Sequence, residues 1–334
     1  MGGIMQQLIM AAWGKPLTGL GLILAGLLLI AFAVYFHYAS ELFSTRLADG
    51  SYMRILRWRP KLHRSLPFEG HLTATYAALR KVGRLKENNG ILASYLFRWI
   101  REGVVEVVSH DHHGRPVIAV RLLAPKPQMT AAEERLYLLL EDASKKTGLI
   151  EEYALEEWAG PHRLGLVWWQ WICAAEGLEY LAQRGMMKET PSRWLWGVFY
   201  FEGGDRFTQN GGQRVSEALG FWRYTRKPDR EQLILARGLW DSMLEFALFF
   251  GTAHHIESAL QAADAERYRQ HQRSWGNGAT ARTIEVCYRL AYAAAKGMLV
   301  PPVTNWHAYR PEPSVLNPNG RIEPSASIDP AKSE

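Results

Sequence analysis

The sequence has little cysteine and lacks the short motifs that mark the common enzyme classes. Its two cysteines, Cys173 and Cys287, lie far apart and belong to no CxxC or Cys/His spacing, so no disulfide framework is indicated. We expect both to be buried as small hydrophobic residues. There is no Walker loop, no GxGxxG turn after a strand and no GxSxG elbow. We therefore predict no catalytic residue and no cofactor.

Histidine is clustered in two places, and neither cluster has the spacing of a metal site. Residues 110–113 read His-Asp-His-His, and side chains that alternate along a hairpin cannot all converge on one ion. Residues 254–257 lack the i, i+4 histidine pair of the HExxH helix. We interpret the first cluster as a solvated turn and the second as a helix start, so no metal is predicted.

Charge is missing between Lys15 and Glu41. An apolar run of about 20 residues is long enough to cross the hydrocarbon core of a bilayer. We predict a single transmembrane helix over residues 17–38, preceded by an extracytoplasmic N-terminus, residues 1–16. The alternative is a cleaved signal peptide, but the run is longer than usual and has no cationic start.

A basic linker follows over residues 39–65. Residues 46–64 of this linker carry a net charge of +5, because six cations stand against one aspartate, Asp49; the cations are Arg46, Arg54, Arg57, Arg59, Lys61 and Arg64. Positive charge beside a membrane helix stays in the cytoplasm and binds anionic lipid headgroups. We therefore predict a protein of the bacterial inner membrane, with its C-terminal region in the cytoplasm and membrane lipids as one partner.

Residues 66–126 have the order of a winged helix. Apolar periodicity predicts helices over residues 72–82 and 88–101. Two β-branched runs, residues 104–108 and 117–122, predict a hairpin closed by the polar turn 109–116. This is a first winged-helix-like unit.

Residues 127–210 repeat that order. Thr130 and Glu133 form a capping box before a helix that we expect to end near Gly148. Helices over 151–158 and 163–184, one strand over 194–201 and a glycine-rich loop over 203–212 complete a second winged-helix-like unit.

Residues 211–302 are predicted to be helical, and residues 303–334 to be a disordered tail, because the tail has too few aliphatic residues to form a core. The helices are expected over 212–222, 230–251, 253–271 and from about 279 to 295. Their aromatic residues should share one core, and these are Phe221, Trp222, Trp240, Phe246 and Phe250. The predicted fold class is one transmembrane helix with a mainly α (α+β) cytoplasmic region.

Three stretches resemble a family of bacterial membrane proteins known as domain of unknown function 2207 (DUF2207). They are residues 91–107, residues 179–185, and residues 218–224 followed by 239–251. The resemblance covers about residues 66–262 and implies a cytoplasmic, winged-helix-like part on a membrane protein. It implies no activity, and the family's large extracytoplasmic domain and further membrane spans have no counterpart here.

Tryptophan is concentrated in the second unit. Trp168 and Trp169 are adjacent, so they cannot both lie on one buried helical stripe. One interpretation is a core of large side chains, and the other is an exposed patch that binds a partner. The partner-binding candidates are Trp168, Trp169, Trp194 and Trp196.

The leading hypothesis is a membrane-anchored, non-enzymatic adaptor that binds an unidentified protein of a bacterial envelope system. The alternative is a membrane-tethered transcription regulator that places residues 88–101 in a DNA groove. Its candidate contacts, which could also meet lipid, are Arg84, Lys86, Arg98, Arg101 and Arg115. Over residues 80–115 seven cations stand against four acids, a net charge of +3, so we do not expect nucleic acid as a partner. An enzyme whose site is assembled from distant residues is a weaker alternative, and the oligomeric state is not indicated.

Overall fold

The computed structural model describes residues 25–29, 45–53, 60–85, 90–112, 115–145, 147–190, 193–195, 199–201, 204–275 and 282–299. Of the predicted membrane helix, only residues 25–29 fall within these ranges, and they are helical. None of the described helices combines the length and the apolar character that a membrane crossing requires. The remainder of segment 17–38 and the predicted tail 303–334 lie outside the described residues.

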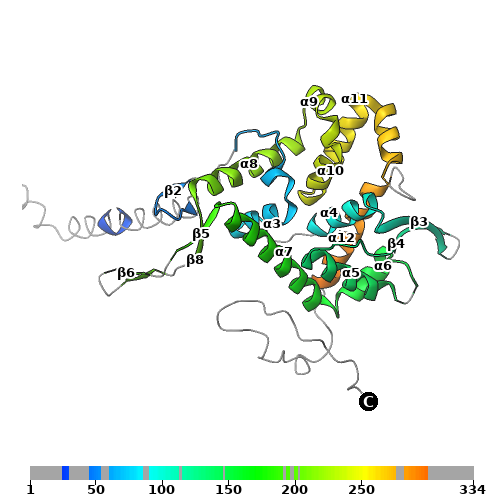
Figure 1. The fold of residues 1–334 in the computed structure, drawn as a ribbon, viewed down its shortest axis with the longest axis horizontal. Coiled ribbons are helices and arrows are strands. Elements are labelled where there is room, and N and C mark those ends of the chain that lie inside the picture. The colour runs from blue at the N-terminus through cyan, green and yellow to red at the C-terminus, as the bar shows by residue number, and fades with distance from the viewer. Residues whose placement is uncertain are drawn as a thin grey trace, which may run out of the picture. The chain divides into compact units, whose positions relative to one another are not determined.

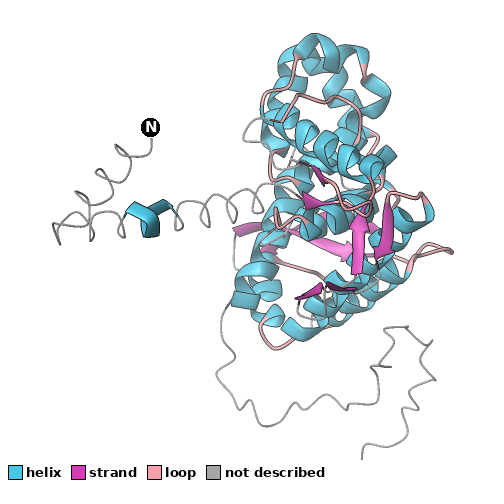
Figure 2. Ribbon diagram, turned by 90° about the vertical axis from the view of Figure 1, so that its left-hand side faces the viewer, coloured by secondary structure: helices cyan, strands magenta, loops and turns pink. Residues whose placement is uncertain are grey.

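The described chain is mainly helical, with short antiparallel strand pairs (Figures 1 and 2). In the basic linker, β1 (Thr45–Arg46) pairs with β2 (Tyr52–Met53). The first section contains the 3-10 turn η1 (Pro67–Gly70), α3 (Leu72–Lys81), α4 (Gly90–Arg101), β3 (Val105–His112) and β4 (Arg115–Leu122). This confirms the order helix, helix, hairpin.

The hairpin is longer than expected. Its ladder runs from Val105 opposite Leu122 to His112 opposite Arg115. The predicted turn over 109–116 was therefore wrong, because most of its polar residues lie within the paired strands.

The second section contains three helices, as predicted. They are α5 (Ala131–Ser144), α6 (Glu152–Ala159) and α7 (Arg163–Gln183). The capping box is confirmed: Glu133 N donates to Thr130 Oγ1 at 3.3 Å, and Thr130 N donates to the Glu133 carboxylate at 3.0 Å. Gly185, at a φ of +65°, ends α7 in the left-handed region that favours glycine.

The segment after α7 differs from the prediction. Instead of one strand over 194–201, β6 (Arg193–Leu195) pairs with β7 (Phe199–Phe201), nested inside a pair of β5 (Met187–Thr190) with β8 (Gly204–Phe207). The expected loop over 203–212 is also wrong, because Thr208 Oγ1 accepts from Gly211 N at 3.2 Å and caps a helix there. Gly211 meets the Met186 carbonyl so closely that a Cβ would clash.

The third section is helical as predicted, but its second helix is broken. The elements are α8 (Gln209–Arg226), α9 (Arg230–Leu235), the 3-10 turn η2 (Arg237–Leu239), α10 (Trp240–Phe249), α11 (Ala253–Arg273) and α12 (Thr283–Leu299). The break at η2 lets Trp240 Nε1 donate to Leu233 O at 2.7 Å.

The predicted aromatic core of the third section is confirmed. Phe221 lies with its ring centroid 6.1 Å from that of Phe246, and Trp222 stacks on Phe250 at 5.4 Å. Trp240 is buried beside Tyr268.

One hydrophobic core contains residues of all three sections. Helix α3 packs along α7, α4 packs against α10 and α12, and α6 packs against α12 (Figure 1). The described residues of these three sections accordingly belong to a single compact unit. The two helix-and-hairpin sections are therefore not separate bodies.

The contact between α3 and α7 depends on one glycine. A Cβ placed on Gly177 would lie 2.1 Å from the carbonyl oxygen of Thr73 and 2.7 Å from the Cβ of Ala77. The obstacle is backbone, which cannot move aside as a flexible side chain could. Gly177 thus sets how closely the two helices approach.

We predict that Gly177→Ala destabilises the protein by at least about 2 kcal/mol, because overpacking a core costs about 1–3 kcal/mol even where side chains can adjust. The measurement is the urea midpoint of the full-length chain in detergent. The control is Gly238→Ala in η2, since nothing lies within 4 Å of a Cβ there. Equal midpoints for the two variants would contradict the tight crossing.

Candidate functional site

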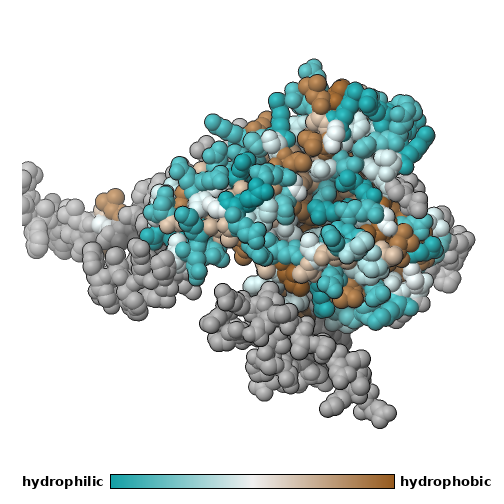
Figure 3. Space-filling model, in the orientation of Figure 1, coloured by the Kyte–Doolittle hydropathy of each residue, from teal (hydrophilic) through white to brown (hydrophobic). Residues whose placement is uncertain are grey.

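An exposed apolar stripe runs along the N-terminal half of α7. It consists of Leu164, Trp168 and Trp171, whose exposed fractions are 61%, 47% and 58%. The spacing i, i+4, i+7 places the three side chains on one face of the helix. Figure 3 shows that the face it draws carries hydrophobic residues among hydrophilic ones. Large side chains grouped in this way are typical of a contact surface. We call these three residues the α7 stripe.

The opposite face of α7 is buried. Trp169 is 1% exposed, and its Nε1 donates to Ala132 O at 3.0 Å. Of the two adjacent tryptophans, the structure thus presents Trp168 to solvent and holds Trp169 in the core, where it cannot reach a partner. Trp194 lies in β6, but its side chain and all of Trp196 are outside the described residues.

Basic side chains border both ends of the α7 stripe. At the Trp171 end, the Arg80 guanidinium lies over the indole at 4.9 Å from the ring centroid. Lys81 and Arg84 follow Arg80 and are exposed. At the Leu164 end, Arg163 is exposed, and an Arg135 nitrogen lies 3.8 Å from where a Gly165 Cβ would stand. The stripe therefore combines an apolar centre with positive ends.

Two of the predicted nucleic-acid contacts are paired within the protein instead. Arg98 binds the Glu245 carboxylate through two of its nitrogens, and Arg101 Nε lies 3.2 Å from Asp241 Oδ2. Burial raises the pKa of Glu245, and the charges of Arg98 and Arg101 oppose that rise. Burial also disfavours the charge on Arg98, yet Glu245 holds the pKa of Arg98 above its ordinary value.

The helix that carries these arginines is a core helix. Every residue of α4 from Ile91 to Phe97 is buried, as are Trp99 and Ile100. Of the other candidate contacts, Arg84 is exposed, Arg115 begins β4 with its side chain undescribed, and Lys86 is outside the described residues.

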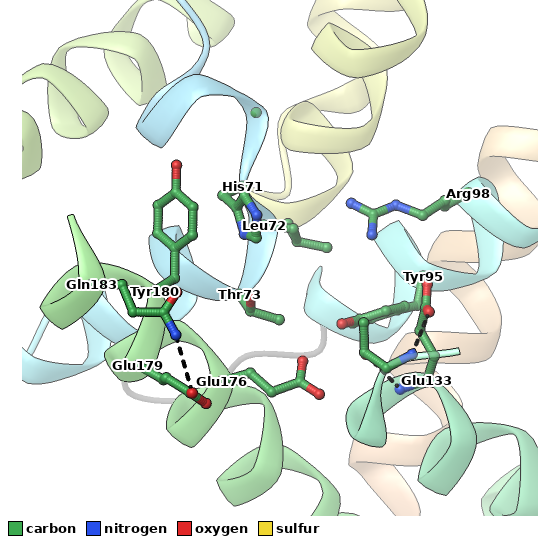
Figure 4. A pocket seen from close by; sticks show the side chains of 12 residues that line it. His71, Leu72, Thr73, Tyr95, Arg98, Glu133, Glu176, Glu179, Tyr180 and Gln183 are labelled. Carbon is green, nitrogen blue, oxygen red and sulfur yellow. Dashed lines mark hydrogen bonds between the residues drawn. The ribbon is translucent and has the colours of Figure 1, made fainter. Parts of the chain in front are cut away.

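A pocket of about 550 Å³ lies between the start of α3, α4, the start of α5 and α7 (Figure 4). Its carboxylates already have partners within the protein. Glu133 pairs with Lys126 Nζ at 2.6 Å, Glu176 accepts from Ala132 N at 2.8 Å, and Glu179 accepts from Gln183 Nε2 at 3.1 Å. Burial raises the pKa of Glu176. Of these three bonds, that of Glu176 joins α7 to α5, and all three carboxylates are engaged within the protein.

His71 lies at the mouth of this pocket and stacks on Tyr180, with ring centroids 3.8 Å apart. Burial lowers the pKa of His71, and the nearby charges of Arg98 and Arg184 lower it further. The stacked His71 ring thus packs the start of α3 against α7.

The structure describes part of the first histidine cluster and both cysteines. Within the described ranges, no group of three or more His, Cys, Asp or Glu residues could hold a metal ion. His110 Nε2 lies 3.1 Å from Glu151 Oε1. Cys173 and Cys287 are buried free thiols, as expected, and burial raises both pKa values.

The basic linker is placed only in part. Arg46 lies in β1, Lys61 is exposed, and Arg64 pairs with Asp229 at 3.6 Å. Arg54, Arg57 and Arg59 lie outside the described residues.

Comparisons with known proteins found no match. No family model, no curated protein and no solved structure matches the chain. The resemblance to DUF2207 therefore stays a prediction, and the residues themselves carry the functional argument.

We predict that Glu245→Ala destabilises the protein by about 3–5 kcal/mol, because removing one partner leaves a largely buried Arg98 charge uncompensated. Chemical unfolding followed by tryptophan fluorescence measures the change. Arg289→Ala is the control, since its 2.5 Å bridge to Glu152 is solvent-exposed and such pairs contribute about 0–1 kcal/mol. A loss as small for Glu245→Ala as for the control would show that the pair is not structural.

Proposed function

We propose that this protein is a membrane-anchored, non-enzymatic adaptor of a bacterial envelope system. In this proposal the helical region is cytoplasmic and docks another protein on the α7 stripe. The observation that carries the proposal is the exposure of Leu164, Trp168 and Trp171 on one face of a helix whose other face is buried. Tryptophan dominates the energetics of many protein interfaces.

The alternative of a DNA-binding regulator has less support. The order of helices and hairpin is compatible with two winged-helix-like units, but a groove-reading helix must offer an exposed face. Helix α4 is buried along nearly its whole length, and Arg98 and Arg101 pair with Glu245 and Asp241. Base-edge contacts would require these ion pairs to break.

The alternative of an enzyme also has less support. The pocket is the strongest candidate for an active site among the described residues, and its three carboxylates bond to Lys126, Ala132 and Gln183. A general base needs a carboxylate or imidazole directed at a substrate rather than engaged in packing. The adaptor proposal leaves these bonds intact.

The basic linker is hydrogen-bonded to the helical region that follows it. Ala48 N donates to Phe207 O at 2.9 Å, and Arg223 Nη1 donates to Pro60 O at 2.9 Å. The described parts of the linker are thus bonded to β8 and α8, so a membrane helix before the linker would hold the helical region close to the bilayer.

We predict that a photo-crosslinking amino acid at Trp168 captures one discrete protein in native membranes. The reason is that an exposed stripe residue would touch the docked partner. The measurement is a shifted band on a denaturing gel, identified by mass spectrometry.

The matched control is the same amino acid at Leu235, which is 78% exposed on α9, away from the stripe. The same band from both positions, or no band from Trp168, would contradict docking on the α7 stripe. Loss of the Trp168 band on changing Trp171 to Ser would support it.

A further inference from the structure

We infer that the partner segment is apolar and acidic: large apolar side chains cover Leu164, Trp168 and Trp171, and carboxylates meet the cations at the two ends. This inference rests on the proposed function and adds the chemistry of the partner. It follows from the charges around the stripe, one end at a time.

At the Trp171 end, Arg80 is already oriented. Its guanidinium stacks over the Trp171 indole, and Nη1 donates to the Tyr76 hydroxyl at 3.4 Å. No carboxylate in the described part of the chain forms an ion pair with Arg80, Lys81 or Arg84. An arginine held on a ring loses little further freedom when it binds a carboxylate through two nitrogens.

At the Leu164 end, the same pattern recurs. Neither Arg163 nor Arg135 forms an ion pair with any described acidic residue. Glu134 and Glu141 are exposed on α5, and their spacing of seven residues places them on one face of that helix. Arg135 and Leu139, which approach Gly165, lie on a different face of α5. The stripe therefore ends in positive charge on both sides, and a complementary partner carries negative charge.

An anionic bilayer would offer the same charge, but the position of the stripe favours a protein. The C-terminal end of α7 leads into β5, which pairs with β8 at Phe207, and Phe207 O accepts from Ala48 in the linker. Trp171 is twelve residues before Gln183, so it lies about 18 Å further along the helix from this membrane-proximal end. Leu164 lies further still.

The experiment is a selection of random 16-residue peptides displayed on phage against the full-length protein in phosphatidylcholine nanodiscs. Peptides that also bind the doubly changed Trp168→Ser, Trp171→Ser protein are removed. We expect the surviving peptides to combine Leu, Phe or Trp with Asp or Glu. Their affinity should fall about tenfold or more with Arg80→Glu, because the change places like charges against each other at the interface.

Leu235→Ser is the control and should leave peptide binding unchanged, because this residue is exposed outside the stripe. Enrichment of Lys and Arg, or equal binding by the Arg80→Glu protein, would overturn the inference. Stripe-dependent binding to vesicles containing phosphatidylglycerol, or to an oligonucleotide, that is tighter than binding to any selected peptide would overturn it too.

The failure of this inference differs from the failure of the proposed function. If crosslinks form at Trp168 but the selected peptides show no acidic bias, the adaptor proposal stands and the partner chemistry is wrong. If no crosslink forms at Trp168, the proposed function itself has failed.

Discussion

The close crossing of α3 and α7 at Gly177 is the constraint on which the rest of the molecule depends. Because the Thr73 carbonyl oxygen would stand 2.1 Å from a Cβ on this residue, only glycine allows the two helices to meet. The crossing decides which face of α7 is buried, and so places Trp169 in the core and Trp168 in solvent. It also brings Arg80, at the end of α3, onto Trp171. The surface that we assign to a partner is thus a consequence of how the core is packed.

A second constraint acts on α4. A helix buried on nearly all sides can carry arginines only if their charges are compensated, since an unpaired buried charge is very costly. Asp241 and Glu245 of α10 provide that compensation for Arg98 and Arg101. These ion pairs join α4 of the first section to α10 of the third. They also engage the positive charges that a DNA-binding helix would need for its contacts.

Much of the helical part of this fold could be predicted from the sequence, because the signals for a helix lie in residues that are close together in the chain. The capping box at Thr130, the glycine stop at Gly185 and the apolar periodicity of α4 are properties of neighbouring residues. The nested strand pairs after α7 and the break at η2 depend on pairings and contacts between residues distant in sequence, and local patterns do not contain them.

The candidate site was predictable only in part, for a similar reason. Adjacency shows that Trp168 and Trp169 face different ways, but not which one is exposed. The acids that pair with Arg98 and Arg101 were missed, although their spacing was a signal: Asp241 and Glu245 are i, i+4 on one helix, and the arginines are i, i+3 on another. Matching such pairs requires knowing that α4 and α10 touch.

The most direct test of the central claim, an exposed α7 stripe on the cytoplasmic side of the membrane, is the labelling of Trp168→Cys with a membrane-impermeant maleimide. The two native cysteines are buried and give little background. We expect no labelling in intact spheroplasts, and labelling as strong as that of a Leu235→Cys control once the inner membrane is opened and detergent with high salt has released the partner. Labelling in intact spheroplasts, or none after opening while the control reacts, would contradict the claim.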